Sequence, residues 1–154
     1  MVCTSPQLNL LSASRRHVAD AERLRAESPD QAWHLAGFGP ECARKVLVFD
    51  TSLAPKALHQ SLGHDFSGRS DEALLEWVLR LDPHAHRYAP TGWSTAHPAL
   101  TGWRPDHRYD PTGTVVTRAR PLDDLLAAAR HLVDRVTADL WMDGQLPSTW
   151  RADL

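Results

Sequence analysis

Residues 28–49 read SPDQAWHLAGFGPECARKVLVF, and this stretch decides the fold. Ser28 suits the residue before a helix, Pro29 the first helical position, and Gln31 the returning partner of a capping box. Apolar residues then cover most of the circumference of a helix expected over 29–49, which is typical of the central helix of a bundle. Pro40 removes a backbone donor in its middle, so we expect a kink near residues 36–40 or a broken helix.

The segment before this stretch has the period of an amphipathic helix. Between residues 10 and 27, one face is apolar and the other carries acidic and basic side chains. Only about three residues separate this helix from the next one. The two helices are therefore expected to pack as an antiparallel hairpin.

Towards the C-terminus, residues 121–142 predict another long helix, with Asp123 and Asp124 at its positive end. Asp143 and Gly144 supply its stop. Between the two long helical regions, residues 55–62 favour a short helix and 71–81 a third substantial one. We expect an all-α, up-and-down bundle of four to five helices, a single domain over 1–154 with loose ends about 1–8 and 144–154.

Residues 82–121 contain six of the eleven prolines and no sustained period, which is typical of a long loop before the last helix. The same stretch also holds Tyr88, Trp93, Trp103 and Tyr109. Disordered segments are usually poor in aromatic residues. We therefore expect much of this loop to be ordered and packed on the bundle.

Composition excludes several classes of protein. The formal net charge of −2 argues against a strongly basic nucleic-acid binder, although a local basic patch remains compatible with it. Cys3 and Cys42 are too few for a disulfide framework and favour free thiols in a reducing compartment. No apolar run approaches the length of a membrane span, and no signal peptide is evident. We expect a cytoplasmic protein that does not enter a membrane.

Two groups of residues are candidates for binding. Arg104, His107 and Arg108 can meet phosphate and Tyr109 can stack on a base, but the same residues can also pack at the end of a bundle. Glu41 and Lys45 lie four residues apart, either as a surface ion pair or beside a buried polar site. His84 and His86 alone are a weak metal signal, so we expect no metal and no cofactor.

Three stretches together resemble the HEPN (higher eukaryotes and prokaryotes nucleotide-binding) family. Residues 16–24 look like its first helix and residues 32–45 like its second, which typically reads small-aromatic-x-Leu-Ala-Gly-aromatic, then Glu-Cys, then Lys. Trp103 followed by Arg108 and Tyr109 resembles the Trp…Arg-Tyr before the last helix in many relatives. The resemblance implies a helical bundle, often a homodimer, that is either a metal-independent endoribonuclease or an inactive partner of a nucleotidyltransferase.

Ribonucleases of this family use an Arg and a His separated by four to six residues near the start of the last helix. Here only Arg80 and His86 have that spacing, and they lie before the long loop. We therefore expect a non-catalytic module that binds a nucleotide, RNA or a partner protein through Glu41, Lys45 and the 104–109 segment, in a toxin–antitoxin or defence system. The alternatives are an endoribonuclease with Arg80 and His86 as catalytic residues, or a purely structural bundle.

Overall fold

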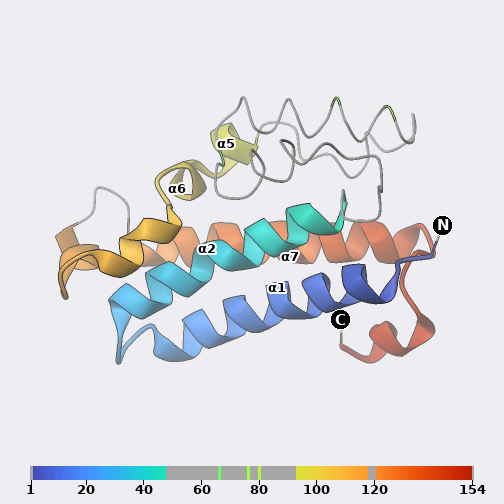
Figure 1. The fold of residues 1–154 in the computed structure, drawn as a ribbon, viewed down its shortest axis with the longest axis horizontal. Coiled ribbons are helices and arrows are strands. Elements are labelled where there is room, and N and C mark those ends of the chain that lie inside the picture. Colours follow the sequence, from blue (N-terminus) through green and yellow to red (C-terminus); the bar gives the residue numbers. More distant parts are fainter. Residues whose placement is uncertain are drawn as a thin grey trace.

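The computed structural model describes residues 2–47, 93–117 and 121–153, together with Phe66, Glu76 and Arg80. Within these ranges every regular element is helical, which confirms the predicted all-α bundle. Three long helices form it: α1 (Ser5–Leu24), α2 (Pro29–Val46) and α7 (Leu122–Met142). α2 and α7 run in the same direction, and α1 runs against both (Figure 1).

Five shorter helices lie within residues 93–117 and 121–153. The α-helices among them are α5 (Trp93–Ala96) and α6 (Pro98–Thr101), and the 3-10 helices are η2 (Pro105–Tyr109), η3 (Thr114–Thr117) and η4 (Ser148–Asp153). None of the helices in the described ranges is both long enough and apolar enough to cross a lipid bilayer. The predicted helix over 55–62 lies outside the described residues. Of the predicted helix over 71–81, only Glu76 and Arg80 are described, and both are helical.

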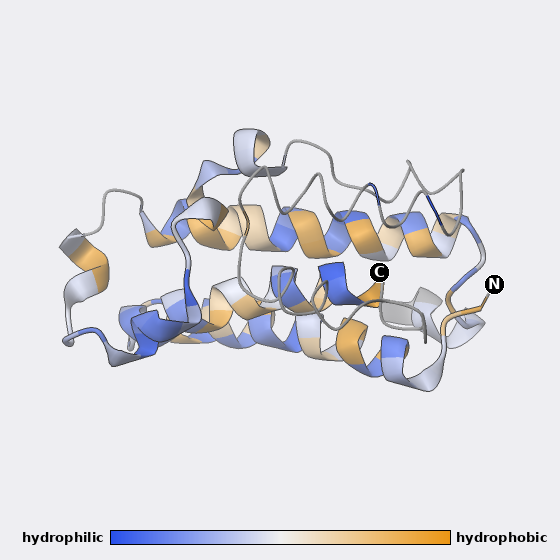
Figure 2. Cartoon of the chain, turned by 45° about the horizontal axis from the view of Figure 1, so that its top comes forward, coloured by the Kyte–Doolittle hydropathy of each residue, from blue (hydrophilic) through white to orange (hydrophobic). Residues whose placement is uncertain are grey.

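The core lies where the three long helices meet. Each of them carries a hydrophobic face and a hydrophilic face (Figure 2), and the hydrophobic faces are buried against one another. α2 contributes buried residues from most of its circumference, as its composition predicts. The central buried residues are Leu11, Val18, Trp33, Val46, Leu125, Leu132 and Val136.

The middle of α2 differs from the prediction. The helix is continuous from Pro29 to Val46 with Pro40 inside it, so the alternative of a broken helix is wrong. At two glycines the backbone of α2 packs directly against neighbouring side chains. A Cβ at Gly37 would lie 2.1 Å from ring carbons of Trp103, and one at Gly39 would lie 2.6 Å from Val18. Tight packing on both sides therefore fixes a helix that proline alone would weaken.

The N-terminal end is not loose, and the first helix begins five residues earlier than predicted. Thr4 precedes it, and the Thr4 backbone N–H donates to Gln7 Oε1 at 2.8 Å. Gln7 Nε2 in turn donates to the carbonyl of Val46, 2.9 Å away at the end of α2. These bonds satisfy terminal backbone groups of both helices, which is why the helix starts at Ser5.

The C-terminal end is also fastened, contrary to the prediction for 144–154. α7 stops at Met142 and Gly144 adopts φ +66°, as its stop signal predicts. The chain then turns back: the Cys3 backbone N–H donates to the Gln145 carbonyl at 2.8 Å, and Leu146 is buried. The backbone at Cys3 and the turn that follows α7 are thus held against each other beside the bundle.

The N-cap of α2 shows a smaller difference. Ser28 precedes the helix, as predicted, but its side chain makes no capping hydrogen bond and Gln31 is exposed. The carboxylate of Asp30 instead accepts hydrogen bonds from the backbone N–H groups of Gly113, at 2.6 Å, and Val115, at 2.9 Å. A side chain in the first turn of α2 therefore holds the segment that follows η2.

Candidate functional site

One face of α2 carries the side chains from which a site can be built. His34, Phe38, Glu41 and Lys45 follow one another at spacings of four, three and four residues, which places them in one row along the helix. The rings of His34 and Phe38 meet edge to face with centroids 4.8 Å apart. Glu41, only 4% exposed, forms an ion pair with Lys45.

α1 adds a histidine to this row. The ring of His17 lies 5.7 Å from that of Phe38, between centroids. Glu41 is close enough to raise the pKa of His17 electrostatically, although burial outweighs it and lowers that pKa overall. His17 therefore lies beside this row of α2, close enough to interact electrostatically with both Glu41 and His34.

η2 closes the other end of the row with the predicted binding segment. Trp33 Nε1 donates to His107 Nδ1 at 3.2 Å, and the Arg104 backbone N–H donates to the same nitrogen at 3.3 Å. His107 is therefore the tautomer with its proton on Nε2, as inferred from these two donors. The Arg108 guanidinium lies 4.7 Å from the centroid of the Tyr109 ring, and Tyr109 is 75% exposed.

Trp103 is the residue that places η2 on α2. It is 1% exposed, its ring lies against Gly37, and its Nε1 donates to the His34 carbonyl at 3.1 Å. Phe38 and Phe66 contact the same ring edge to face, at 5.0 and 6.1 Å between centroids. The expectation that the Trp-containing loop is ordered and packed on the bundle is confirmed for residues 93–117.

We call the surface formed by His17, His34, His107, Arg108 and Tyr109 the histidine face. Burial lowers the pKa of His34 below its ordinary value, and the charges of Arg108, His107 and His17 lower it further. Burial likewise lowers the pKa of His17. Both rings are therefore largely neutral at pH 7, and an anion nearby would favour their protonated forms.

The predicted site residues are brought together only in part. His107, Arg108 and Tyr109 lie on the histidine face, and Arg104 begins the same segment with an exposed side chain. Glu41 follows His34 by seven residues, about 10 Å along the helix axis. Glu41 and Lys45 therefore belong to the far end of the row, where their ion pair fits the structural interpretation.

The other predicted pair is described only at Arg80. Its side chain is exposed and forms an ion pair with Glu76, one helical turn earlier. His86 lies outside the described residues, as does His84. No cluster of three or more His, Cys, Asp or Glu side chains that could hold a metal is present in the described ranges.

Sequence reasoning missed His17 and His34. Neither residue was singled out, because each lies within a helix whose apolar period dominates the pattern. The signal that was available is the row of polar and aromatic side chains at helical spacing on α2, which interrupts an otherwise apolar helix. What could not be read from the sequence is that His17 and Arg108 would approach that row.

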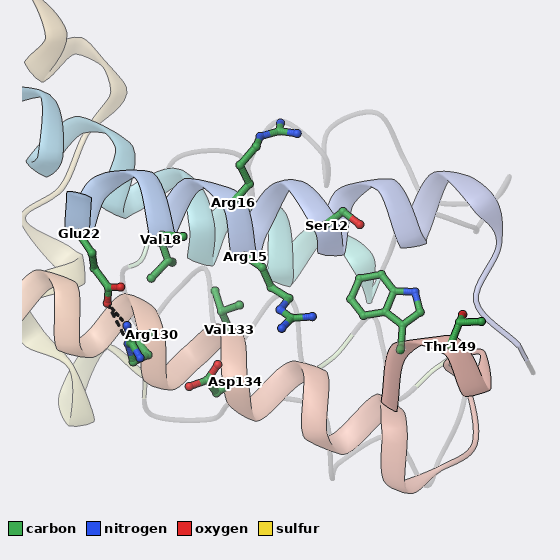
Figure 3. Close-up of a pocket in the computed structure, with 11 residues that line it drawn as sticks. Ser12, Arg15, Arg16, Val18, Glu22, Arg130, Val133, Asp134 and Thr149 are labelled. Atoms are coloured by element: carbon green, nitrogen blue, oxygen red, sulfur yellow. Dashed lines mark hydrogen bonds and ion pairs between the residues drawn. The ribbon is translucent and has the colours of Figure 1, made fainter. Parts of the chain in front are cut away.

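Two further features lie away from the histidine face. A groove of about 710 Å³ runs between α1 and α7, with η4 at one end (Figure 3); we call it the α1/α7 groove. On another part of α7, His131 Nδ1 lies 2.9 Å from His97 Nε2, and Trp93 stacks on His97. This histidine pair attaches α5 and α6 to α7 beside a cavity of about 450 Å³.

No protein-family model, no curated protein and no solved structure matches this chain.

We expect the free energy of unfolding to fall as the pH is lowered from 7.5 to 5. The pKa values of His17, His34 and His97 are lowered in the folded protein, mainly by burial. As the pH falls, the unfolded chain, with histidine pKa values near ~6.5, therefore takes up protons before the folded protein does. The stability that is present above pH ~6.5 is consequently lost as the pH falls below it. Urea denaturation at the two pH values measures this loss. The His17→Gln/His34→Gln variant should lose less; an equal loss would contradict the assignment.

Proposed function

We propose that this protein is an HEPN-like, non-catalytic module that binds single-stranded RNA through the histidine face. The observation that carries the proposal is that His34 lies within the electrostatic influence of His17, His107 and Arg108, and that the Arg108 guanidinium lies over the exposed ring of Tyr109. The family assignment itself is supported by the resemblance of residues 16–24 and 32–45, which fall in α1 and α2.

The chemistry of this face suits a phosphate-bearing strand. Arg108 offers a permanent positive charge, and His17 and His34 gain protons when an anion approaches. Tyr109 exposes a ring on which a base can stack without regard to sequence, an interaction worth about 1–3 kcal/mol per base. This local cluster supplies the positive charge that the chain as a whole, with its net charge of −2, lacks.

Binding of a fluorescein-labelled uridine 12-mer, followed by fluorescence anisotropy at pH 6.5 and low salt, tests this function. Tyr109→Ala is expected to weaken binding about tenfold, and Arg108→Ala to weaken it and flatten its salt dependence by about 0.7 in the log–log slope. Arg23→Ala is the matched control, because Arg23 is an exposed arginine of α1 paired with Asp20. Equal affinities for all four proteins would contradict the proposal, as would no binding by the unaltered protein.

A second candidate is metal-independent RNA cleavage, and one observation favours it. His34 is held largely neutral within the influence of Arg108, so an imidazole able to take a proton lies near a cation able to stabilise phosphorane charge. Incubation of the protein with labelled RNA in EDTA distinguishes this candidate from binding alone. Cleavage abolished by His34→Ala or His107→Ala would place catalysis on this face, and cleavage abolished by Arg80→Ala or His86→Ala would place it on the pair predicted from spacing.

A further inference from the structure

The α1/α7 groove has an apolar floor and charged walls. Val18 and Val133 are buried at its base, and both point between the helices in Figure 3. Arg15 points into the groove, and its guanidinium lies 5.7 Å from the centroid of the Trp150 ring. The groove therefore combines a cation and an aromatic ring, the two features with which proteins bind single-stranded nucleic acid.

The charges of the groove are unevenly distributed. Arg130 donates through Nε to Glu22 at 2.9 Å, so these two side chains largely neutralise each other at one end. Asp134 stands on the α7 wall and Arg15 on the α1 wall. The lining carries three arginines, at positions 15, 16 and 130, against two carboxylates, at 22 and 134, so its balance of charge favours a phosphate, while Asp134 can accept N–H groups of a base.

Arg16 connects this groove with the histidine face. It borders the groove, but its side chain points away from it (Figure 3). Its charge also lowers the pKa of His17 and acts on that of Cys42 in α2. Arg15, Arg16 and His17 are consecutive, and residues of an α-helix are turned by about 100° each, so the three wrap around more than half of α1.

We propose that an RNA strand bound on the histidine face continues across α1 over Arg16 into the α1/α7 groove, where Arg15 contacts a phosphate and Trp150 stacks on a base. This inference rests on the proposed function and names its ligand as an oligonucleotide rather than a mononucleotide. Neighbouring helix axes lie about 8–10 Å apart, so the path from η2 to the groove spans roughly 20 Å. Sites of about four nucleotides or more are normal for single-strand binding.

The test compares fluorescein-labelled uridine 4-mer and 12-mer by anisotropy. Arg15→Ala and Trp150→Ala are each expected to weaken binding of the 12-mer about tenfold and to change binding of the 4-mer less than twofold. Tyr109→Ala should weaken binding of both. Trp150→Tyr keeps an aromatic ring in the groove and should retain most of the affinity for the 12-mer.

Arg23→Ala again serves as the matched charge control on α1, outside the groove. Groove variants that bind the 12-mer as tightly as the unaltered protein would overturn the path while leaving the proposed function standing. Groove variants that weaken both oligonucleotides equally would also overturn it, since the loss would then not depend on strand length. Failure of the unaltered protein to bind either oligonucleotide would overturn both proposals.

Discussion

Replacing Trp103 with alanine is expected to lower the free energy of unfolding by about 3–5 kcal/mol. Trp103 is 1% exposed and is the largest fully buried side chain among the residues that the structure describes. Its loss removes the ring contacts with Phe38 and Phe66 and the hydrogen bond to the His34 carbonyl, and it leaves a cavity between η2 and α2. Urea denaturation followed by far-UV circular dichroism measures the change.

Trp103→Phe is the matched variant for this prediction. Phenylalanine keeps an aromatic ring against Gly37 but lacks the indole N–H, so part of the volume and one hydrogen bond are lost. We expect a cost of about 1–2 kcal/mol, clearly smaller than that of alanine. A cost below ~1.5 kcal/mol for Trp103→Ala would mean that the ring does not hold η2 on the bundle.

Gly37→Ala is expected to have the second largest effect, although alanine is the better helix former. The added methyl carbon would lie 2.1 Å from carbons of the Trp103 ring, far inside van der Waals contact. Either α2 or the ring must move, and overpacking of this kind costs about 1–3 kcal/mol or more. Gly102→Ala is the control, because a Cβ there meets no neighbour closer than 3.8 Å.

The two substitutions should be strongly coupled. In a Trp103→Ala background the ring that opposes a methyl group at Gly37 is gone, so Gly37→Ala should cost little or even stabilise α2 by up to about 1 kcal/mol. Denaturation of both single variants and the double variant provides the coupling energy. Additive effects would show that the clash is relieved by some route other than movement of this ring.

The long helices were predictable because their signals are local. α7 extends over Leu122–Met142 against an expected 121–142, since an unbroken apolar stripe lies between Pro121 and Gly144. α2 begins at Pro29 as expected, with Ser28 before it. Capping residues, helical period and terminal proline or glycine act within a few residues of one another, so the sequence reveals them directly.

The ends of the chain were predicted wrongly because long-range bonds hold them. Gln7 is bonded to Val46, 39 residues away, and Cys3 is bonded to Gln145. Nothing within a short window of sequence indicates either partner. For the same reason Pro40 suggested a break in α2, whereas packing of Trp103 and Val18 on the neighbouring glycines holds the helix continuous.

The sequence alone determined that this chain forms an all-helical bundle, and it singled out the polar segment 104–109 as a candidate for binding, because period, caps and residue type are local properties. Only the tertiary structure decided that His34 lies near that segment with His17 beside it, and that Arg15 and Trp150 share a groove. These groups come from α1, α2, η2 and η4. Their approach is set by how the buried faces pack, above all by an indole fitted against a glycine, and such packing depends on residues far apart in the chain.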